Sequence, residues 1–165
     1  GYVDEVVFVP TGDFYEKEDL IDFQDRVNML ELSIDNVTNM SVSKIGGDKK
    51  LEFTYQVLDE IARIYGTADV YFICGADNLE DFLNWKNYEY ILNKYRILVV
   101  KRGDYEISEL LDRYDRYRDR ILVVEFDSDD ISSTKIRRDI KNAIDMLDKR
   151  VYDYIIKKKL YEKEE

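Results

Sequence analysis

Residues 121–138 read ILVVEFDSDDISSTKIRR and pass from a strand, through a polar turn, into a helix. The apolar run Ile121–Phe126 predicts a buried strand. The spacing of Ile136, Ile140 and Ile144 predicts that a helix follows it. A helix that begins after a strand and a Ser/Thr-rich turn is typical of a phosphate site, because its free N–H groups and its positive dipole end face the anion.

The first turn of this helix is rich in hydroxyl and cationic side chains. Ser132, Ser133 and Thr134 supply the hydroxyl groups, and Lys135 and Arg137 supply positive charge. These groups would complete the cradle that a helix start offers to a phosphate. In an alternative interpretation, Ser132 or Ser133 only caps the helix, which is a common role for serine.

The length and composition of the chain predict one globular domain over residues 1–165. The hydrophobic fraction is 45% and the charged fraction 37%, which excludes a disordered chain. The one cysteine, Cys74, lies in an apolar run, excludes an internal disulfide framework and fits a reducing, cytoplasmic compartment. The sequence shows neither a signal peptide nor an apolar stretch long enough to cross a bilayer, so we expect no membrane partner.

The net charge of −11 limits the classes of ligand. Nucleic-acid binding relies on surplus Lys and Arg to displace counterions, so we expect no nucleic-acid partner. Any anionic ligand must therefore be held by a local cationic patch or by a divalent metal. The chain contains no histidine, which removes the commonest general base and all His-based triads.

Apolar runs alternate with amphipathic segments along the whole chain. The predicted strands are Glu5–Val9, Met40–Ile45, Val70–Cys74, Arg96–Val100 and Ile121–Phe126. The predicted helices contain the apolar faces Phe23/Val27/Leu30/Ile34, Val57/Ile61/Ile64 and Ile107/Leu110/Leu111, followed by helices near Ser133–Asn142 and Asp148–Lys159. Tyr15–Asp22 and Gly46–Leu51 are predicted loops. This alternation predicts an α/β fold with a doubly wound, Rossmann-like parallel sheet.

The chain begins almost directly with the strand-like run at residues 1–6. In open α/β sheets the first strand is usually central, with ligands at the switch point beside it. We therefore expect that a segment is missing upstream of this run.

Further candidate site residues lie mostly at the ends of predicted strands or the starts of predicted helices, where ligands of α/β proteins bind. They are Thr11 and Gly12 after the first strand, Thr54 at a helix start, Gly75 and Asp77 after the third strand, Trp85 shortly beyond, and Arg102 after the fourth. Each also has a structural interpretation. Trp85 would be an ordinary core residue, Asp77 a helix cap and Arg102 a solvated cation. Arg26, at the start of the first helix, is interpreted as half of a structural ion pair.

Taken together, these segments resemble the nicotinate-nucleotide adenylyltransferase family of nucleotidyltransferases. The matching motifs are Val9–Gly12, Arg26–Leu30, Phe53–Thr54, Gly75–Asp77 followed by Trp85, Val99–Gly103, Ile131–Arg137, and a terminal Val151…Tyr154–Ile155…Leu160–Tyr161 pattern. The motifs occur in the family's order over nearly the whole chain.

The resemblance implies adenylyl transfer from ATP to nicotinate mononucleotide, with Mg²⁺ bridging the phosphates, in bacterial NAD biosynthesis. It implies that Ser132, Ser133, Thr134 and Arg137 bind ATP, with Arg137 as the catalytic cation, and that Gly75 and Asp77 contact a ribose or shape its loop. It also implies that Trp85 stacks on the pyridine ring and that Thr54 receives the nicotinate carboxylate. Arg102, Thr11 and Gly12 would complete the substrate site.

The chain departs from the family pattern at three places. The family's Gly-x-Phe-x-Pro-x-His-x-x-His turn is absent, Gly103 directly follows Arg102 where proline is usual, and the loop after Gly12 is acidic. The first departure implies, by the resemblance, that one βα unit is missing upstream, and from it we expect impaired activity of the chain as given. Two alternatives stay open: another adenylyltransferase, such as a pantetheine-phosphate adenylyltransferase, and a non-catalytic nucleotide-binding protein. The sequence leaves open whether the chain forms a homo-oligomer.

Overall fold

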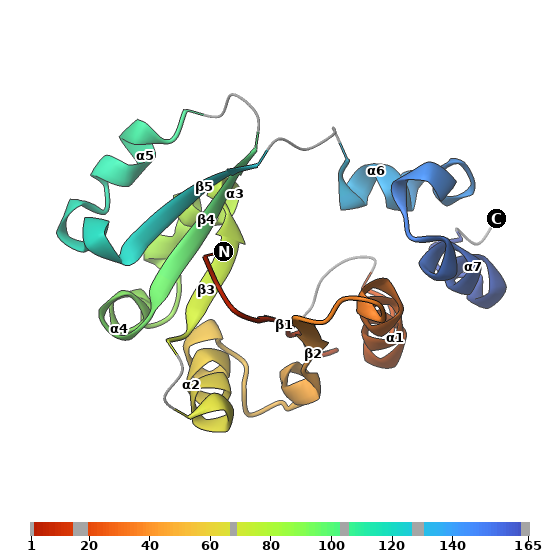
Figure 1. Cartoon of the computed structure of the whole chain (residues 1–165), viewed down its shortest axis with the longest axis horizontal. Helices are drawn as coiled ribbons and strands as arrows, with labels where there is room; N and C mark the ends of the chain where they lie inside the picture. The colour runs from red at the N-terminus through yellow and green to blue at the C-terminus, as the bar shows by residue number, and fades with distance from the viewer. Residues whose placement is uncertain (1, 15–19, 67–68, 103–105, 127–130, 163–165) are drawn as a thin grey trace. The chain divides into compact units, whose positions relative to one another are not determined.

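The computed structural model describes residues 2–14, 20–66, 69–102, 106–126 and 131–162 (Figure 1). The chain divides into two compact units. The first comprises Gly1–Glu52 with Asp130–Glu165, and the second comprises Phe53–Asp129. The predicted turn at 128–130 and most of the predicted loop Tyr15–Asp22 lie outside the described residues.

The first unit contains a small parallel sheet and the helix that connects its strands. Strand β1 (Val6–Phe8) pairs in parallel with β2 (Met40–Val42), with Val7 opposite Ser41. Helix α1 (Phe23–Ile34) connects the two strands, and the Asp22 carboxylate caps it by accepting from the N–H of Gln24 at 2.8 Å. These two strands and this helix confirm the β–α–β alternation that the sequence predicts.

The carboxyl-terminal part of the first unit corrects the predicted helix Ser133–Asn142. Helix α6 spans only Ser133–Arg138, and 3₁₀ turns follow at Ile140–Asn142 and Ile144–Met146. The break lies at Asp139, whose backbone leaves the helical region at φ −143° and ψ 65°. The Asp139 N–H donates to the Ile136 carbonyl at 3.2 Å, three residues back, and the Asn142 N–H donates to the Asp139 carbonyl at 3.2 Å, so 3₁₀-type bonds replace the α-helical pattern here.

Helix α7 (Lys149–Lys158) closes the first unit and packs on α1. The shared core consists of Ile140, Ala143, Val151 and Ile155, with Met29 and Leu32 of α1 against it. The two helices are also joined by polar contacts, because the Tyr154 hydroxyl donates to Asp25 at 2.6 Å and accepts from Asn28 at 2.8 Å. These contacts fix α7 to the helix that follows β1.

The second unit contains a parallel sheet of order β3-β4-β5. The strands span Tyr71–Gly75, Arg96–Arg102 and Ile121–Phe126, and the helices are α2 (Thr54–Tyr65), α3 (Ala76–Asp81), α4 (Tyr88–Lys94) and α5 (Ser108–Asp112). The consecutive residues Ile97, Leu98 and Val99 of β4 are all buried. A strand buried on both faces is typical of the centre of a parallel α/β sheet.

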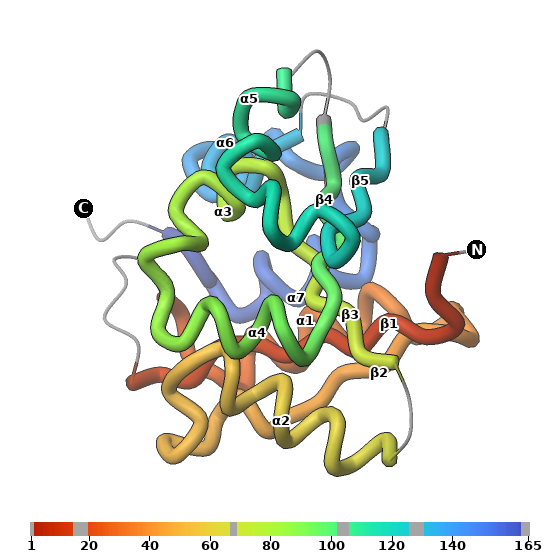
Figure 2. Tube along the Cα trace, turned by 90° about the vertical axis from the view of Figure 1, so that its left-hand side faces the viewer, coloured from red at the N-terminus to blue at the C-terminus, as the bar shows by residue number. Residues whose placement is uncertain are grey.

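Helices α2 and α4 of the second unit lie side by side (Figures 1 and 2). Asp59 of α2 joins them, because it accepts from the hydroxyl of Tyr90 at 2.9 Å and from the ammonium group of Lys94 at 2.7 Å. The hydroxyl of Tyr95 donates to the same carboxylate. These hydrogen bonds join α2 to α4 and to Tyr95, beside the hydrophobic core of the second unit.

The parallel pairing of all five described strands confirms the predicted α/β class. Within the described residues, these strands form a two-stranded and a three-stranded sheet. Helices α3 and α4 were not predicted, because segments of six and seven residues are too short to show clear helical periodicity. The single domain over residues 1–165 stays a prediction.

Two observations bear on reactivity and on membranes. Cys74 is buried in β3, and this burial, with the nearby charge of Asp77, raises the pKa of its thiol to about 12. The thiol is therefore inert at neutral pH, as its predicted packing role requires. No helix in the described part of the chain is long and apolar enough to span a membrane.

Candidate functional site

The predicted phosphate-binding segment lies at the start of α6 in the first unit. Ser132 caps this helix, with extended backbone angles and a side-chain oxygen that accepts from the N–H of Lys135 at 3.2 Å. The capping interpretation is therefore correct for Ser132. Ser133 and Thr134 occupy the first turn, and their side chains are exposed. The N–H groups of a first turn have no acceptor within their own helix, so this end of α6 can still bind an anion.

Arg137 lies three residues further along α6 and is half-buried. It forms no ion pair with any carboxylate in the described residues, so its charge is not neutralised within this part of the chain. Its positive charge acts on the hydroxyl of Tyr161. Burial raises the pKa of the Tyr161 hydroxyl, and the positive charges of Arg137 and Arg26 oppose this rise. A guanidinium without a carboxylate partner, beside exposed hydroxyl groups, can neutralise a phosphate.

The Thr11–Gly12 turn of the first unit is fixed by Arg26 of α1. The Arg26 guanidinium donates to the backbone carbonyl of Thr11 and, at 3.3 Å, to the Thr11 hydroxyl. It also forms an ion pair with Asp13 at 2.6 Å and donates through Nε to the Ile21 carbonyl at 2.9 Å. This confirms the interpretation of Arg26 as a structural ion-pair residue, and it shows which segment Arg26 holds.

Two glycines allow this turn to lie close to the segment after β2. A Cβ atom on Gly46 would come within 2.0 Å of the Pro10 carbonyl oxygen, so the backbones at these positions are in direct contact. A Cβ atom on Gly12 would lie 2.8 Å from the Gly46 carbonyl oxygen. Glycine is therefore required at position 46, because any side chain there would clash with the Pro10 carbonyl. The Thr11–Gly12 turn is thus held by Arg26 and also contacts the backbone at Gly46.

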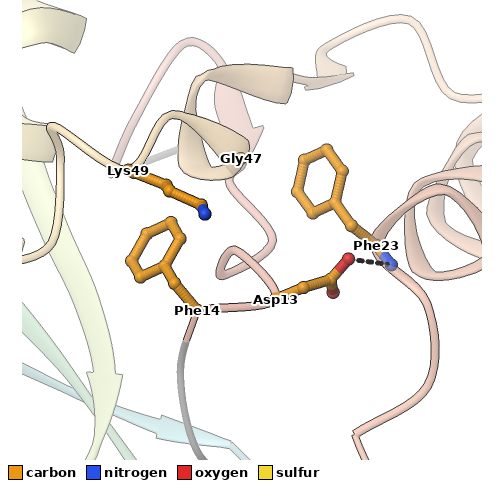
Figure 3. Close-up of a pocket in the computed structure, with 5 residues that line it drawn as sticks. All are labelled: Asp13, Phe14, Phe23, Gly47 and Lys49. Atoms are coloured by element: carbon orange, nitrogen blue, oxygen red, sulfur yellow. Dashed lines mark hydrogen bonds between the residues drawn. The ribbon is translucent and has the colours of Figure 1, made fainter.

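A pocket of about 290 Å³ opens beside this turn (Figure 3). It is lined by Asp13, Phe14, Phe23, Gly47 and Lys49. The Asp13 carboxylate accepts from the backbone N–H of Phe23 at 3.2 Å, as the dashed line in Figure 3 marks. Sequence reasoning did not find this pocket, because its residues come from three separate segments and carry no common motif.

In the second unit, Gly75, Asp77 and Arg102 lie at the carboxyl edge of the β3–β4 pair. Gly75 ends β3 opposite Val100 of β4, and Arg102 ends β4 two positions further along. Asp77 lies in the first turn of α3 and is exposed. The structure therefore brings these three positions to the sheet edge where α/β ligands bind.

Asp77 does not cap α3, since Gly75 is the residue at the cap position and makes no side-chain cap. The Asp77 carboxylate instead turns back toward Gly75. A Cβ atom on Gly75 would lie 2.3 Å from its Oδ1. The Asp77 carboxylate can occupy this place only because Gly75 has no side chain.

Trp85 directly follows the 3₁₀ turn Phe82–Asn84. Its ring packs against Phe82, at a centroid distance of 5.0 Å, and edge-on against Phe72 of β3 at 5.6 Å. Since it is half-buried, Trp85 is both a core residue and a ring with exposed surface. Trp85 therefore packs in the core, as its structural interpretation states. Stacking on the pyridine ring stays a prediction.

Thr54 is the first residue of α2 and is half-buried. The preceding N–H, that of Phe53, is bonded to the Gln56 side chain at 2.9 Å. The N–H groups of the first turn lie at the same helix end as the Thr54 hydroxyl. This helix start therefore offers several hydrogen-bond donors to a carboxylate. Thr54 thus lies where the predicted binding of the nicotinate carboxylate requires it, at a helix start with free donors.

The predicted residues therefore fall into two sets. The first unit carries Thr11, Gly12, Ser132, Ser133, Thr134 and Arg137, and the second carries Thr54, Gly75, Asp77, Trp85 and Arg102. Within the described residues, no group of three or more carboxylate, cysteine or histidine side chains could hold a metal ion.

Comparison with known proteins gives one consistent result. Residues 2–139 match the family model described as Cytidylyltransferase-like. The chain is 32% identical over 160 residues to a probable nicotinate-nucleotide adenylyltransferase of Acholeplasma laidlawii, covering 96% of this chain and 82% of that protein. It is 35% identical over 144 residues to one of Endomicrobium trichonymphae, covering 84% and 72% of the two chains.

A solved structure shares the fold. The nicotinic acid mononucleotide adenylyltransferase of Plasmodium falciparum, complexed with NaAD, superimposes with a TM-score of 0.77 at 21% identity. The match covers 97% of this chain and 83% of that one. At this identity the match supports the fold alone, and it agrees with the parallel α/β pairing seen here.

Proposed function

The chain belongs to the nicotinate-nucleotide adenylyltransferases of the cytidylyltransferase-like family, and we propose that it transfers the adenylyl group of ATP to nicotinate mononucleotide. In this reaction a phosphate oxygen of the mononucleotide attacks the α-phosphorus of ATP. A new P–O bond forms, the bond from the α-phosphorus to the bridging oxygen breaks, and pyrophosphate leaves. Such chemistry depends on positioning and charge neutralisation and needs no covalent nucleophile.

The ATP phosphates would bind at the start of α6. Ser133 and Thr134 would donate through their hydroxyl and backbone N–H groups, and the Ser132 hydroxyl, already the helix cap, would fix the turn. Arg137 would neutralise the charge that grows on the phosphate during transfer. The observation that carries this assignment is that Arg137 forms no ion pair in the described part of the chain.

Nicotinate mononucleotide would be held mainly by residues of the second unit. The exposed face of Trp85 would stack on the pyridine ring, and Thr54 with the first N–H groups of α2 would receive the carboxylate. Asp77, beside Gly75, would accept from a ribose hydroxyl. Arg102 would add positive charge at the same sheet edge. Within the first unit, Thr11 and Gly12 are proposed as substrate-binding residues.

Mg²⁺ is proposed as a companion of the ATP phosphates. The described residues contain no carboxylate cluster that would form a protein cage for a cation. This fits Mg²⁺, which commonly keeps several waters and binds through substrate phosphates. When bound, the ion would neutralise phosphate charge.

The test is a product assay with the purified full-length protein, ATP and Mg²⁺, because the chain as given is expected to have impaired activity. Separate reactions contain nicotinate mononucleotide, nicotinamide mononucleotide or phosphopantetheine, and chromatography measures each dinucleotide or adenylylated product. The proposal expects the nicotinate dinucleotide and pyrophosphate in equal amounts. Adenylylation of phosphopantetheine instead would favour the other adenylyltransferase.

Calorimetry with the same ligands distinguishes the non-catalytic alternative. Binding of ATP and nicotinate mononucleotide by the full-length protein without any product would identify a nucleotide-binding protein and would overturn the proposed catalysis.

A further inference from the structure

We infer that the pocket lined by Asp13, Phe14, Phe23, Gly47 and Lys49 is a subsite for an aromatic group that carries a phosphate, with Lys49 as the phosphate-binding cation. The inference rests on the proposed function, because it makes the pocket part of the substrate site. Lys49 was not among the site residues predicted from the sequence.

Charge is the first argument. The Asp13 carboxylate in the pocket wall is already neutralised, since one oxygen pairs with Arg26 at 2.6 Å and the other accepts from the Phe23 N–H at 3.2 Å. Lys49 has no ion pair or hydrogen bond within the described residues, and its amino group is exposed. Counted over the described residues, the pocket therefore presents one net positive charge in a chain whose net charge is −11.

The shape and walls of the pocket are the second argument. The rings of Phe14 and Phe23 line it, and in Figure 3 the Lys49 amino group points toward the space between them. A Cβ atom on Gly47 would lie 2.8 Å from the Phe23 ring, so the absence of a side chain at this position keeps the space open. A volume of about 290 Å³ suits one ring with its anionic group and is at the small end for ligand pockets.

The connection to the predicted substrate turn is the third argument. Asp13 directly follows Gly12, and the same Arg26 side chain binds both Thr11 and Asp13. A ligand against Asp13 and Lys49 would therefore lie next to the Thr11–Gly12 turn and would be held by the same rigid segment.

Phenyl phosphate is the minimal probe, because it has one ring and one phosphate. We expect it to shift the amide NMR signals of Phe23 and Gly47 on titration, with weaker binding of inorganic phosphate. Lys49→Ala should weaken the affinity for phenyl phosphate about fivefold, the effect of about 1 kcal/mol for one exposed charged contact. The matched control is Lys50→Ala, which removes the next lysine along the chain, one that does not line the pocket.

Three results would overturn the inference. They are the absence of any shift at Phe23 and Gly47, equal losses of affinity in Lys49→Ala and Lys50→Ala, or failure of both nicotinate mononucleotide and AMP to displace phenyl phosphate. Displacement by one of the two nucleotides identifies which substrate uses the subsite. The probe binds without turnover, so failure of the adenylyl-transfer assay would not by itself change this result.

Discussion

The carboxylate of Asp13 lies 2.6 Å from the guanidinium of Arg26, whose side chain is only 13% exposed. Through the same guanidinium, Arg26 also binds Thr11 and the carbonyl of Ile21. One side chain of α1 thus fixes the backbone that leaves β1. The turn predicted to contact substrate is held by α1 before any ligand binds, a form of preorganisation.

Arg26→Gln should release this turn. A neutral amide can replace only part of the charge-assisted hydrogen bonds, and the free energy of unfolding should fall by about 2 kcal/mol. The KM for nicotinate mononucleotide should rise more than kcat falls, because the turn is proposed to bind substrate. Urea unfolding and steady-state kinetics measure the two effects. Arg63→Gln, which removes an exposed pair with Glu60, is the control and should change neither; equal effects of the two variants would contradict the role given to Arg26.

Gly46→Ala should be severely destabilising. The new methyl group would meet the Pro10 carbonyl oxygen at 2.0 Å, and a backbone atom cannot move aside as a side chain can. We expect a loss of about 3 kcal/mol in urea unfolding, at the upper end for overpacking. Gly47→Ala is the matched control, because its methyl group meets the ring of Phe23, and the loss should be clearly smaller. A similar loss in both variants would show that the contact with Pro10 is not decisive.

Two variants of Trp85 separate its packing role from its binding role. Trp85→Ala removes the contacts with Phe72 and Phe82 and should cost about 2 kcal/mol of unfolding free energy, because the residue is only half-buried. Trp85→Phe should keep most of that stability. If the ring stacks on the pyridine, calorimetry should show weaker nicotinate mononucleotide binding in Trp85→Ala and largely retained binding in Trp85→Phe. Unchanged affinity in Trp85→Ala would leave Trp85 as a core residue only.

The Asp59 cluster between α2 and α4 should make stability depend on pH at both extremes. Burial raises the pKa of Asp59, but hydrogen bonds from Lys94, Tyr95 and Tyr90 outweigh this and hold it below its usual value. The stability it contributes is therefore present above the pKa of an unfolded aspartate, about 4, and is lost as pH falls through the lower folded pKa.

Tyr95 gives the opposite sign at high pH. Burial and the bond to Asp59 raise the pKa of its hydroxyl to about 12. The corresponding stability is complete below about pH 10, the pKa of an unfolded tyrosine, and is lost as pH rises toward 12. Urea midpoints measured across pH should decline at both ends. Asp59→Asn should lower the midpoint at pH 7 and flatten the acid decline; an acid decline of unchanged steepness would assign it to other carboxylates.

The strands were predictable because buried parallel strands are continuous apolar runs. Ile121–Phe126 matches β5 at both ends, and the face of Phe23, Val27, Leu30 and Ile34 gave the length of α1. The predicted helix through Asp139 was wrong, because the apolar spacing continues across a residue whose backbone leaves the helical region. Apolar periodicity reports burial and does not report where the backbone stops being helical.

The candidate site was predictable only where its residues form a motif along the chain. Ser132–Thr134 and Arg137 are close in sequence, so one helix start places them together. The pocket with Lys49 needed the fold, because Asp13, Phe23 and Gly47 meet only after α1 and the segment beyond β2 have packed. For Arg26 the sequence predicted an ion pair, but it did not predict the hydrogen bonds that hold the Thr11–Gly12 turn.

Arg137→Gln tests the catalytic assignment with little risk to folding. Arg137 makes no ion pair in the described residues, so its loss should leave the urea midpoint nearly unchanged. If its guanidinium stabilises charge on the transferring phosphate, kcat should fall about 100-fold while the KM for nicotinate mononucleotide changes little. Arg137→Lys keeps the charge but loses the forked geometry, and should recover only part of kcat.

The matched control for this variant is Arg138→Gln, the exposed neighbour on the same short helix. It changes the net charge of α6 by the same amount, so a purely electrostatic effect of the helix would lower kcat equally in both variants. A fall of kcat in Arg137→Gln alone would assign the catalytic effect to the Arg137 side chain. Equal losses, or full activity in Arg137→Gln, would remove Arg137 from the catalytic role and leave α6 as a binding element alone.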